Sequence, residues 1–170
     1  VLPAAAAKNG PELAATLAGS ICQGAGQFCT SPGIILVHKD AASDTFVTAL
    51  AAALQALQPH AMLSTAIRAT FDKGVARWRA DAALTPLVAD VSDAATPRPF
   101  LAEVQAADFI ASHALHEEVF GSAALVVRVV GLPDEKWGEK VAAVVITRPG
   151  VDPRSITQQD IMECCREKLA

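Results

Sequence analysis

The chain has 170 residues, of which 52% are hydrophobic, and its formal charge at pH 7 is −4. This length suffices for one domain with a hydrophobic core, or for a domain with a small appendage. The mild negative charge argues against nucleic-acid binding, which calls for a basic surface. Charged or polar residues interrupt every apolar run before it reaches the length of a membrane span. The sequence starts at Val1 without an initiator Met, so we expect a fragment or a trimmed form. It shows no secretory leader, so we do not expect secretion.

The four cysteines do not form the pattern of a disulfide framework. Cys164 and Cys165 are adjacent on an expected helix and therefore point in different directions. Neither this pair nor Cys22 and Cys29 has the two-residue spacing of a zinc knuckle, so we expect no metal site. Free thiols are typical of a reducing compartment, and we expect a cytoplasmic protein.

The first third of the chain predicts helix, loop and strand. Val1–Pro3 is interpreted as the end of a strand. A helix is predicted over Pro11–Cys22, because proline fits a first helical turn and apolar residues recur at every fourth position. Gly24 and Gly26 end this helix. The apolar run Ile34–Val37 that follows is typical of a buried strand. The apolar positions of the helix are Leu13, Leu17 and Ile21.

Two further helices are predicted next. Ser43 is expected to cap the first of them, which Pro59 ends, and Ser64 to cap the second. Arg68 and Asp72, one turn apart, are expected to pair. The apolar face of the first helix comprises Phe46, Leu50, Leu54 and Leu57, and that of the second comprises Ile67, Phe71, Val75 and Trp78.

The remaining strands predict an α/β fold with a central, mostly parallel sheet and flanking helices. A proline-rich stretch with room for a short strand at Leu87–Val91 precedes the sheet strands Phe100–Val104 and Leu125–Val130. Because strands alternate with helices in the front part, parallel pairing is expected there. A small α+β segment, a hairpin plus a helix, is expected to follow.

The composition changes near residue 131. Residues 131–170 contain 13 of the 32 Asp, Glu, Lys and Arg residues, about twice the density of the first 130. Such a shift can mark a domain border. In this tail we expect a strand at Val141–Thr147, paired antiparallel with Leu125–Val130 across a charged loop, and a final helix capped by Thr157.

Cys29 lies in the glycine-rich loop Gly24–Gly33, which is suited to presenting a thiol. A catalytic cysteine attacks as the thiolate and needs exposure in a pocket. The N–H groups of a tight loop can also stabilise an oxyanion on a bound carbonyl. The alternative is that Cys29 is a small buried apolar residue, as most free cysteines are. Cys22 and Cys165 lie on apolar helix faces and are interpreted as packed side chains.

The residues around this cysteine resemble those of a known protein family. Gly26-Gln27-Phe28-Cys29-Thr30 resembles the active-site motif of the aldehyde dehydrogenase superfamily, and Glu117-Glu118-Val119-Phe120-Gly121 resembles a second motif of that family. The resemblance covers residues 1–129. Phe before the cysteine and Pro-Gly after it are most similar to the α-ketoglutaric semialdehyde dehydrogenase branch.

This resemblance implies roles for three residues. In that family the cysteine adds to an aldehyde, hydride passes to NAD(P)⁺, and an activated water releases the acid. Cys29 matches the nucleophile. Glu118 matches the glutamate that holds the nicotinamide ribose, and Phe120 lies beside it in the same motif. Without the resemblance, Glu117 and Glu118 are an ordinary solvated pair.

Several family features have no counterpart in this sequence. Ser122 replaces the proline that follows Phe-Gly in the family motif. The general base, the oxyanion asparagine and the nucleotide-binding domain of the family match no part of the chain, and no Gly-rich dinucleotide loop is present. We therefore expect that the chain alone binds no NAD or NADP and shows negligible turnover.

The tail carries a second resemblance. The stretch from Val130 through Trp137 to Val141 resembles the C-terminal domain of acyl-CoA synthetases, the adenylate-forming ligases, and the similarity extends over residues 130–170. The family's catalytic lysine has no counterpart, so Lys136 and Lys140 are interpreted as solvated charges. Two resemblances that meet near Val129 predict a chimera.

Three functional hypotheses follow. The first is a dehydrogenase fragment whose partner is a small-molecule aldehyde. The second is a non-catalytic chimeric protein with a structural or interaction role. The third, less well supported, is an accessory segment of an acyl-CoA ligase. A truncated domain leaves apolar faces exposed, so we also expect a homo-oligomer. Neither nucleic acid nor membrane is expected as a partner.

Overall fold

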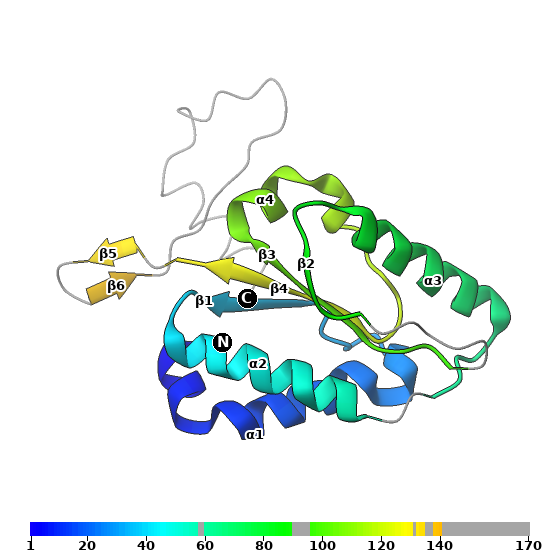
Figure 1. Ribbon diagram of the computed structural model, residues 1–170, viewed down its shortest axis with the longest axis horizontal. Coiled ribbons are helices and arrows are strands. Elements are labelled where there is room, and N and C mark those ends of the chain that lie inside the picture. The colour runs from blue at the N-terminus through cyan, green and yellow to red at the C-terminus, as the bar shows by residue number, and fades with distance from the viewer. Residues whose placement is uncertain (58–59, 90–95, 131, 135–137, 141–170) are drawn as a thin grey trace, which may run out of the picture. The chain divides into compact units, whose positions relative to one another are not determined.

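The computed structural model describes residues 1–57, 60–89, 96–130, 132–134 and 138–140. The chain divides into two compact units, Val1–Val130 and Gly131–Ala170. Figure 1 shows the elements of the first unit. They are α1 (Pro3–Cys22), η1 (Gln23–Gly26), β1 (Ile34–His38), α2 (Ala41–Ala56), α3 (Thr65–Ala80), β2 (Thr85–Val88), β3 (Phe100–Gln105), α4 (Ala106–Ala111), η2 (His113–Leu115) and β4 (Ala123–Val129).

The first unit is built on a four-stranded sheet with strand order β1-β4-β3-β2. β4 pairs in parallel with β1 on one side and with β3 on the other, whereas β2 pairs antiparallel with β3 at the edge. In the central register Ala102 of β3 lies opposite Leu125 of β4, and Leu125 also lies opposite Ile34 of β1. The predicted α/β class and the predicted parallel pairing are therefore confirmed.

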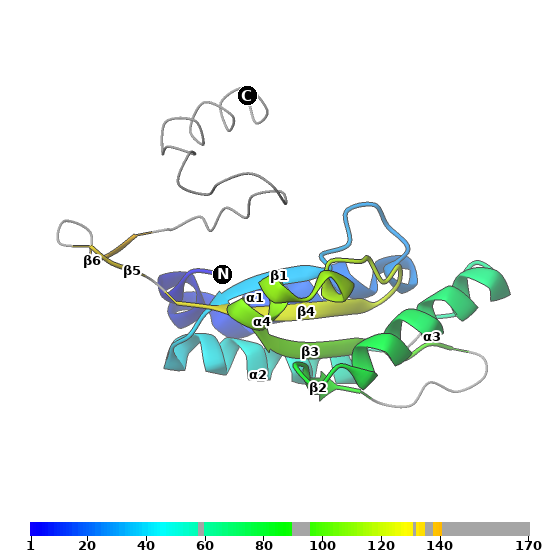
Figure 2. The same cartoon turned by 90° about the horizontal axis from the view of Figure 1, so that it is seen from above.

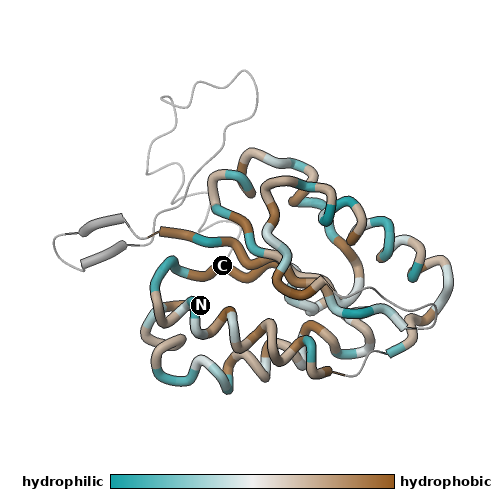
Figure 3. The backbone as a smooth tube through the Cα atoms, viewed as in Figure 1, coloured by the Kyte–Doolittle hydropathy of each residue, from teal (hydrophilic) through white to brown (hydrophobic). Residues whose placement is uncertain are grey.

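Helices cover both faces of this sheet. Figure 1 shows α1 and α2 on one side of the sheet and α3 on the other, and Figure 2 views the sheet face-on with its strands side by side. The hydropathy colouring of Figure 3 places the most apolar backbone in the central strands. Alternate residues of β4 therefore enter two different cores. Ala124 and Val126 pack with α1 and α2, whereas Leu125 and Val127 pack with α3. Burial on both faces explains why β4 is apolar throughout.

Helix α1 is longer than predicted. It starts at Pro3, passes a kink at Asn9 (φ −137°, ψ 27°) and continues through Pro11 to Cys22. The kink lies two residues before Pro11, whose ring is compatible only with the first turn of a helix. The strand end predicted at Val1–Pro3 is therefore wrong, although the Val1 amine does donate to the Leu36 carbonyl of β1.

The caps of α2 and α3 correct one prediction and confirm another. Asp40, and not Ser43, caps α2: its carboxylate accepts the Ser43 backbone N–H at 2.9 Å and the Ser43 hydroxyl at 3.0 Å. Ser64 caps α3 as predicted, by accepting the Ile67 N–H at 3.2 Å. The predicted ion pair on α3 is present as well, with 2.8 Å between Arg68 and Asp72.

Strand β1 differs from its predicted environment. Ile34 and Leu36 are 49% and 54% exposed, whereas Ile35 and Val37 are buried. β1 is an edge strand, and only its α1/α2 face is covered. The strand predicted at Leu87–Val91 is observed at Thr85–Val88, and residues 90 and 91 of the prediction lie outside the described residues.

The second unit is described only in a short hairpin. β5 (Leu132–Asp134) and β6 (Gly138–Lys140) pair antiparallel. The stretch between the two predicted strands is therefore not all loop, since it contains strands of its own. The strand predicted at Val141–Thr147, the helix predicted from Thr157 and the two last cysteines lie outside the described residues. Within the described part, no helix has the length and apolarity to cross a membrane.

Candidate functional site

The cysteine loop begins with a backbone turn that needs positive φ. Gly24 (φ 57°), Ala25 (φ 58°) and Gly26 (φ 72°) are all left-handed, which ends the helical segment and reverses the chain. Glycine adopts this region without strain, whereas Ala25 does so at a cost of about 1–2 kcal/mol. The buried position of Ala25 shows that its methyl group is packed, which offsets part of that cost.

Gly26 brings the loop against the segment that carries the second motif. A Cβ on Gly26 would lie 2.2 Å from the carbonyl carbon of Gly121 and 2.3 Å from the backbone nitrogen of Ser122. Gly121, with φ 145°, is equally constrained, because its own Cβ would lie 2.3 Å from the Phe71 ring of α3. The two motifs that the sequence separates by about 90 residues are thus in backbone contact.

The Gln27 side chain holds the cysteine loop in place through two hydrogen bonds. Its Nε2 donates to the Gly24 carbonyl at 2.8 Å, and its Oε1 accepts the Leu63 backbone N–H at 3.0 Å. The side chain therefore connects the turn to the segment that precedes α3. Gln27 gave no signal of this role in the sequence, because a glutamine in a loop has no distinguishing pattern.

The two described cysteines have different environments. The Cys29 side chain is exposed, whereas Cys22 is half-buried at the end of α1. Desolvation by burial raises the pKa of the Cys22 thiol, and a hydrogen bond with the Ser122 side chain opposes that rise. Cys22 is therefore protonated and shielded near neutral pH. The alternative interpretation of Cys29 as a packed apolar residue is wrong.

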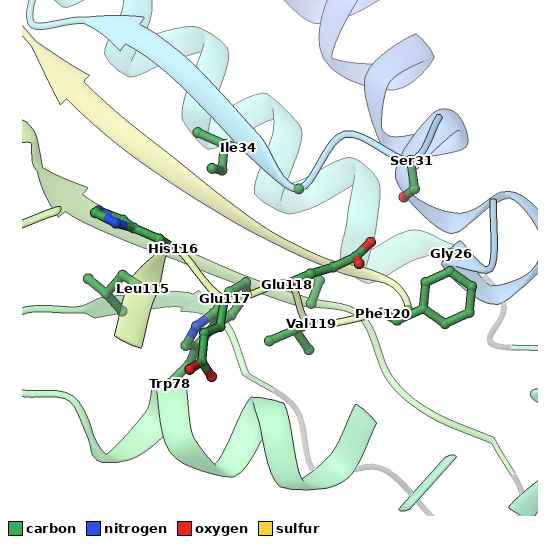
Figure 4. Close-up of a pocket in the computed structure, with 13 residues that line it drawn as sticks. Gly26, Ser31, Ile34, Trp78, Leu115, His116, Glu117, Glu118, Val119 and Phe120 are labelled. Carbon is green, nitrogen blue, oxygen red and sulfur yellow. The ribbon is translucent and has the colours of Figure 1, made fainter. Parts of the chain in front are cut away.

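A cavity of about 240 Å³ lies between the cysteine loop and the second motif. The cysteine loop contributes Gly26 and Ser31, and the second motif contributes Glu118 and Phe120, as Figure 4 shows. Cys29 lies between Gly26 and Ser31 on the same loop but does not itself line the cavity. Two of the three predicted site residues, Glu118 and Phe120, therefore line one cavity, whereas Cys29 is exposed on the loop and is not among the lining residues.

The adjacent glutamates differ in their partners. Glu117 forms an ion pair with Arg77 of α3. Glu118 is exposed and lines the cavity without a hydrogen bond or ion pair among the described residues. The interpretation of both as a solvated pair holds only in part, because Glu117 connects the second motif to α3.

Trp78 lines the same cavity from α3. It is only 3% exposed, and its Nε1 has no hydrogen-bond partner in the described part of the chain. Its ring packs on Phe100, with 6.0 Å between the ring centroids. The helical spacing predicted that Trp78 is buried, but it contained no signal that the N–H is unpaired.

Ser122 occupies the position where the family motif has proline. Its side chain is buried and hydrogen-bonds to Cys22, and its carbonyl accepts the Phe100 N–H at 2.9 Å. The serine side chain thus adds a contact with α1 that proline cannot make, whereas the bond to β3 is made by the backbone carbonyl. Among the described residues, no group of three or more His, Cys, Asp or Glu side chains is placed to hold a metal ion.

Comparison with known proteins bears out both resemblances. The chain is 34% identical over 134 residues to alpha-ketoglutaric semialdehyde dehydrogenase 2 of Azospirillum brasilense, a match that covers 75% of this chain and 25% of the relative. It is also 48% identical over 44 residues to the long-chain-fatty-acid–CoA ligase FadD13 of Mycobacterium tuberculosis, covering 26% of this chain and 8% of the ligase. The chain thus spans about a quarter of its dehydrogenase relative. No protein-family model matches the sequence.

Solved structures agree in fold. One is aldehyde dehydrogenase 21 of Physcomitrella patens in complex with the reaction product succinate, with a TM-score of 0.56, 20% identity, and coverage of 70% of this chain and 26% of that one. Another is the NADP-dependent glyceraldehyde-3-phosphate dehydrogenase of Bacillus halodurans complexed with NADP, with a TM-score of 0.58, 17% identity, and coverage of 71% and 26%. At these identities the matches establish the fold alone. The chain therefore resembles the aldehyde dehydrogenase family in sequence and in fold.

Proposed function

We propose that residues 1–129 are the part of the catalytic domain of an NAD(P)-dependent semialdehyde dehydrogenase that carries the nucleophilic cysteine. We also propose that this chain alone does not catalyse the complete reaction. The observation that carries the proposal is the backbone contact between Gly26 and Gly121. This contact brings the cysteine loop and the Glu118 segment to one cavity, as a shared site requires. Similarity to a semialdehyde dehydrogenase supports the substrate class.

The chemistry assigned to Cys29 is reversible addition to an aldehyde. The thiolate sulfur forms a bond to the aldehyde carbon, the π electrons of the C=O bond move to the oxygen, and the oxygen takes a proton from water. The exposed thiol of Cys29 is accessible to such a carbonyl, whereas burial keeps Cys22 protonated. The product is a hemithioacetal. Without a general base and a hydride acceptor, it can only break down again to the free thiol and the aldehyde.

The cavity fits part of a nicotinamide cofactor and not the whole of one. A volume of about 240 Å³ is below the range of about 300–1,000 Å³ that is typical of drug-sized ligand sites. The exposed Glu118 carboxylate provides an acceptor for a hydroxylated group. Glu118 and Phe120 would hold the nicotinamide ribose, and the cofactor when bound would accept hydride. With no dinucleotide loop in the sequence, the whole dinucleotide is not expected to bind this chain alone.

The proposal is tested with a ¹³C-labelled semialdehyde. In a Cys164→Ala/Cys165→Ala background, which removes the other two thiols, we expect a hemithioacetal carbon signal that is lost in Cys29→Ala and retained in Cys22→Ala, the matched control. NADH formation in the same mixture should stay at background. A signal that persists in Cys29→Ala would refute the assignment of the nucleophile. Steady NADH formation that Cys29→Ala abolishes would contradict the claim that the chain is catalytically incomplete.

A second candidate is a non-catalytic chimera, which the ligase similarity favours. The covered shares of the two matches, 75% and 26%, together equal about one chain length, as expected for two consecutive pieces. The division of the structure after Val130 falls next to the residue at which the two resemblances meet. Intact-mass measurement and sequencing of the expressed gene test this candidate, because an uninterrupted dehydrogenase sequence beyond Val129 would rule it out.

Self-association and the cytoplasmic location remain predictions. The exposed apolar side chains of Phe28, Ile34 and Leu36 support self-association, because they present apolar area on the cysteine loop and on edge strand β1. Light scattering at high protein concentration should give a mass above that of the monomer. A monomer at that concentration would count against the prediction.

A further inference from the structure

Strand β1 forms an open edge of the four-stranded sheet. Among the described strands it pairs only with β4, and Figure 2 shows it as the outermost strand on one side of the sheet. The Gly33 carbonyl accepts a hydrogen bond from β4, and the Lys39 N–H donates one to it. Residues of a paired strand alternate in the direction of their backbone groups, so those of Ile34, Leu36 and His38 point to the open edge.

The opposite edge strand, β2, is protected against pairing. It contains Pro86, which has no N–H to donate, and its register with β3 shifts between Pro86 and Val88. Proline, irregular register and charge are the means by which edge strands avoid pairing with another chain. β1 contains none of these between Ile34 and Val37, and its register with β4 is regular. The described sheet thus has one edge that can pair, and a partner must bring such an edge of its own.

The exposed side chains of β1 are apolar. Ile34 and Leu36 are about half exposed, whereas Ile35 and Val37 are buried in the core with α1 and α2. Burial of apolar surface contributes about 25 cal/mol per Å², so a partner strand that covers the exposed side chains stabilises the pair. The Val1 amine donates a hydrogen bond to the Leu36 carbonyl, so this edge already accepts a donor from outside the sheet.

A second copy of β1 fits this edge in an antiparallel arrangement. In the register centred on Leu36, Leu36 of one copy lies opposite Leu36 of the other, and Ile34 lies opposite His38. These are the residues whose backbone groups point outward, so the register pairs the two open edges with each other. The Leu36 carbonyl exchanges its hydrogen bond with the Val1 amine for one with the Leu36 N–H of the second copy.

The charges at the two ends of β1 are complementary in the same register. Lys39 of one copy lies opposite Gly33 of the other. Gly33 lines the cavity together with Glu118, whose carboxylate forms no ion pair among the described residues. The positive end of each strand therefore lies near the negative end of its partner, and the two-fold axis repeats this attraction. Because β2 is protected, the association closes at two copies.

We propose that β1 is a dimerisation surface, at which two copies of this chain pair antiparallel through Leu36 and continue one sheet into the other. This inference goes beyond the proposed function, and it names the surface and the register of the dimer. Each strand contributes five residues, so we expect the interface to bury less surface than a standard one, whose lower limit is about 1,200 Å². The dimer is therefore weak, with a dissociation constant in the micromolar range.

The first test is sedimentation equilibrium of the whole chain at protein concentrations below and above the micromolar range. We expect a reversible equilibrium between monomer and dimer. Leu36→Lys should raise the dissociation constant about tenfold, because apolar contact is lost and two like charges lie opposite each other. Leu63→Lys is the matched control, since Leu63 is 84% exposed and lies outside the sheet, and it should leave the constant unchanged. A monomer at every concentration, a mass that grows beyond the dimer, or equal effects of the two substitutions would overturn the proposal.

The second test is cross-linking, which reports the register directly. All four native cysteines are replaced by alanine, and a single cysteine is introduced by Leu36→Cys or by Ile34→Cys. In the proposed register the Cα atoms of the two Leu36 positions are about 5.5 Å apart, whereas the two Ile34 positions are separated by about 14 Å along the strands. A short bis-maleimide should link Leu36→Cys into a covalent dimer and should fail to link Ile34→Cys. Equal linking of both variants, or no linking of Leu36→Cys, would overturn the register and with it the proposal.

Discussion

Gly26 lies so close to Gly121 that a single methyl group would not fit between them, since a Cβ on Gly26 would stand 2.2 Å from the Gly121 carbonyl carbon. Backbone atoms cannot move aside as a flexible side chain can. The contact therefore fixes how the cysteine loop lies against the Glu118 segment. It also explains why the turn after α1 uses glycine at Gly26, where φ is 72°.

Replacing Gly26 should be strongly destabilising. Gly26→Ala adds overpacking against backbone, worth about 1–3 kcal/mol, and left-handed strain of about 1–2 kcal/mol, so we expect a loss of about 2–5 kcal/mol. Urea unfolding measures the change. Gly33→Ala is the matched control, because a Cβ on Gly33 meets nothing within 4 Å. Equal stability losses in the two variants would contradict the described contact.

Gln27→Ala should loosen the cysteine loop without unfolding the protein. The variant removes the hydrogen bonds to the Gly24 carbonyl and the Leu63 N–H, each worth about 0.5–1.5 kcal/mol. The measurement is amide hydrogen exchange at Leu63, which should become faster by about tenfold. Gln23→Ala, at an exposed glutamine of the same turn, should leave that rate unchanged. An unchanged rate in Gln27→Ala would show that the loop is held by other contacts.

Asp40→Ala should destabilise α2. The carboxylate caps the helix by accepting the Ser43 N–H at 2.9 Å, and loss of such a cap costs about 0.5–2 kcal/mol. Asp40→Asn keeps a capping oxygen and is expected to retain most of the stability. Thermal or urea unfolding compares the two variants. If Ser43→Ala proved the more damaging change, the identification of Asp40 as the cap would be wrong.

The same cap predicts a pH dependence. The hydrogen bond from the Ser43 backbone lowers the pKa of Asp40 below its ordinary value of 3.8, and the hydrogen bond from His38 contributes. Below pH 3.8 the unfolded chain therefore binds more protons at this position than the folded one. The stabilisation is full above that pH and is lost as the pH falls further. Asp40→Asn should lose less stability over this range than the wild type, and parallel curves would contradict the prediction.

Local patterns were sufficient to predict most of the first unit. Apolar spacing located α2 and α3, and alternation of strands with helices predicted the parallel pairs of β4. The errors came from tertiary structure. Asp40 and Ser43 are equally good cap residues, and the choice between them depends on where β1 ends. The exposure of Ile34 and Leu36 follows from the edge position of β1, which no local pattern encodes.

The candidate site was predictable by residue type but not by arrangement. The loop around Cys29 and the Glu118 segment were both identified from sequence, yet their contact through Gly26 arises only from folding. The unpaired N–H of Trp78 had no signal at all, because helical spacing predicts burial and says nothing about hydrogen-bond partners. Gln27 was missed for a similar reason, since both of its partners are backbone groups.

The accessibility of Cys29 as a nucleophile can be measured by comparing two thiols in one molecule. Native protein is treated with iodoacetamide at neutral pH, and peptide mass spectrometry gives the alkylation rates of Cys29 and Cys22. Because Cys29 is exposed and burial raises the pKa of Cys22, we expect Cys29 to react at least about tenfold faster. In urea the two rates should converge. Equal alkylation rates in the native protein, or a faster reaction at Cys22, would show that the loop does not present Cys29 as the accessible thiol.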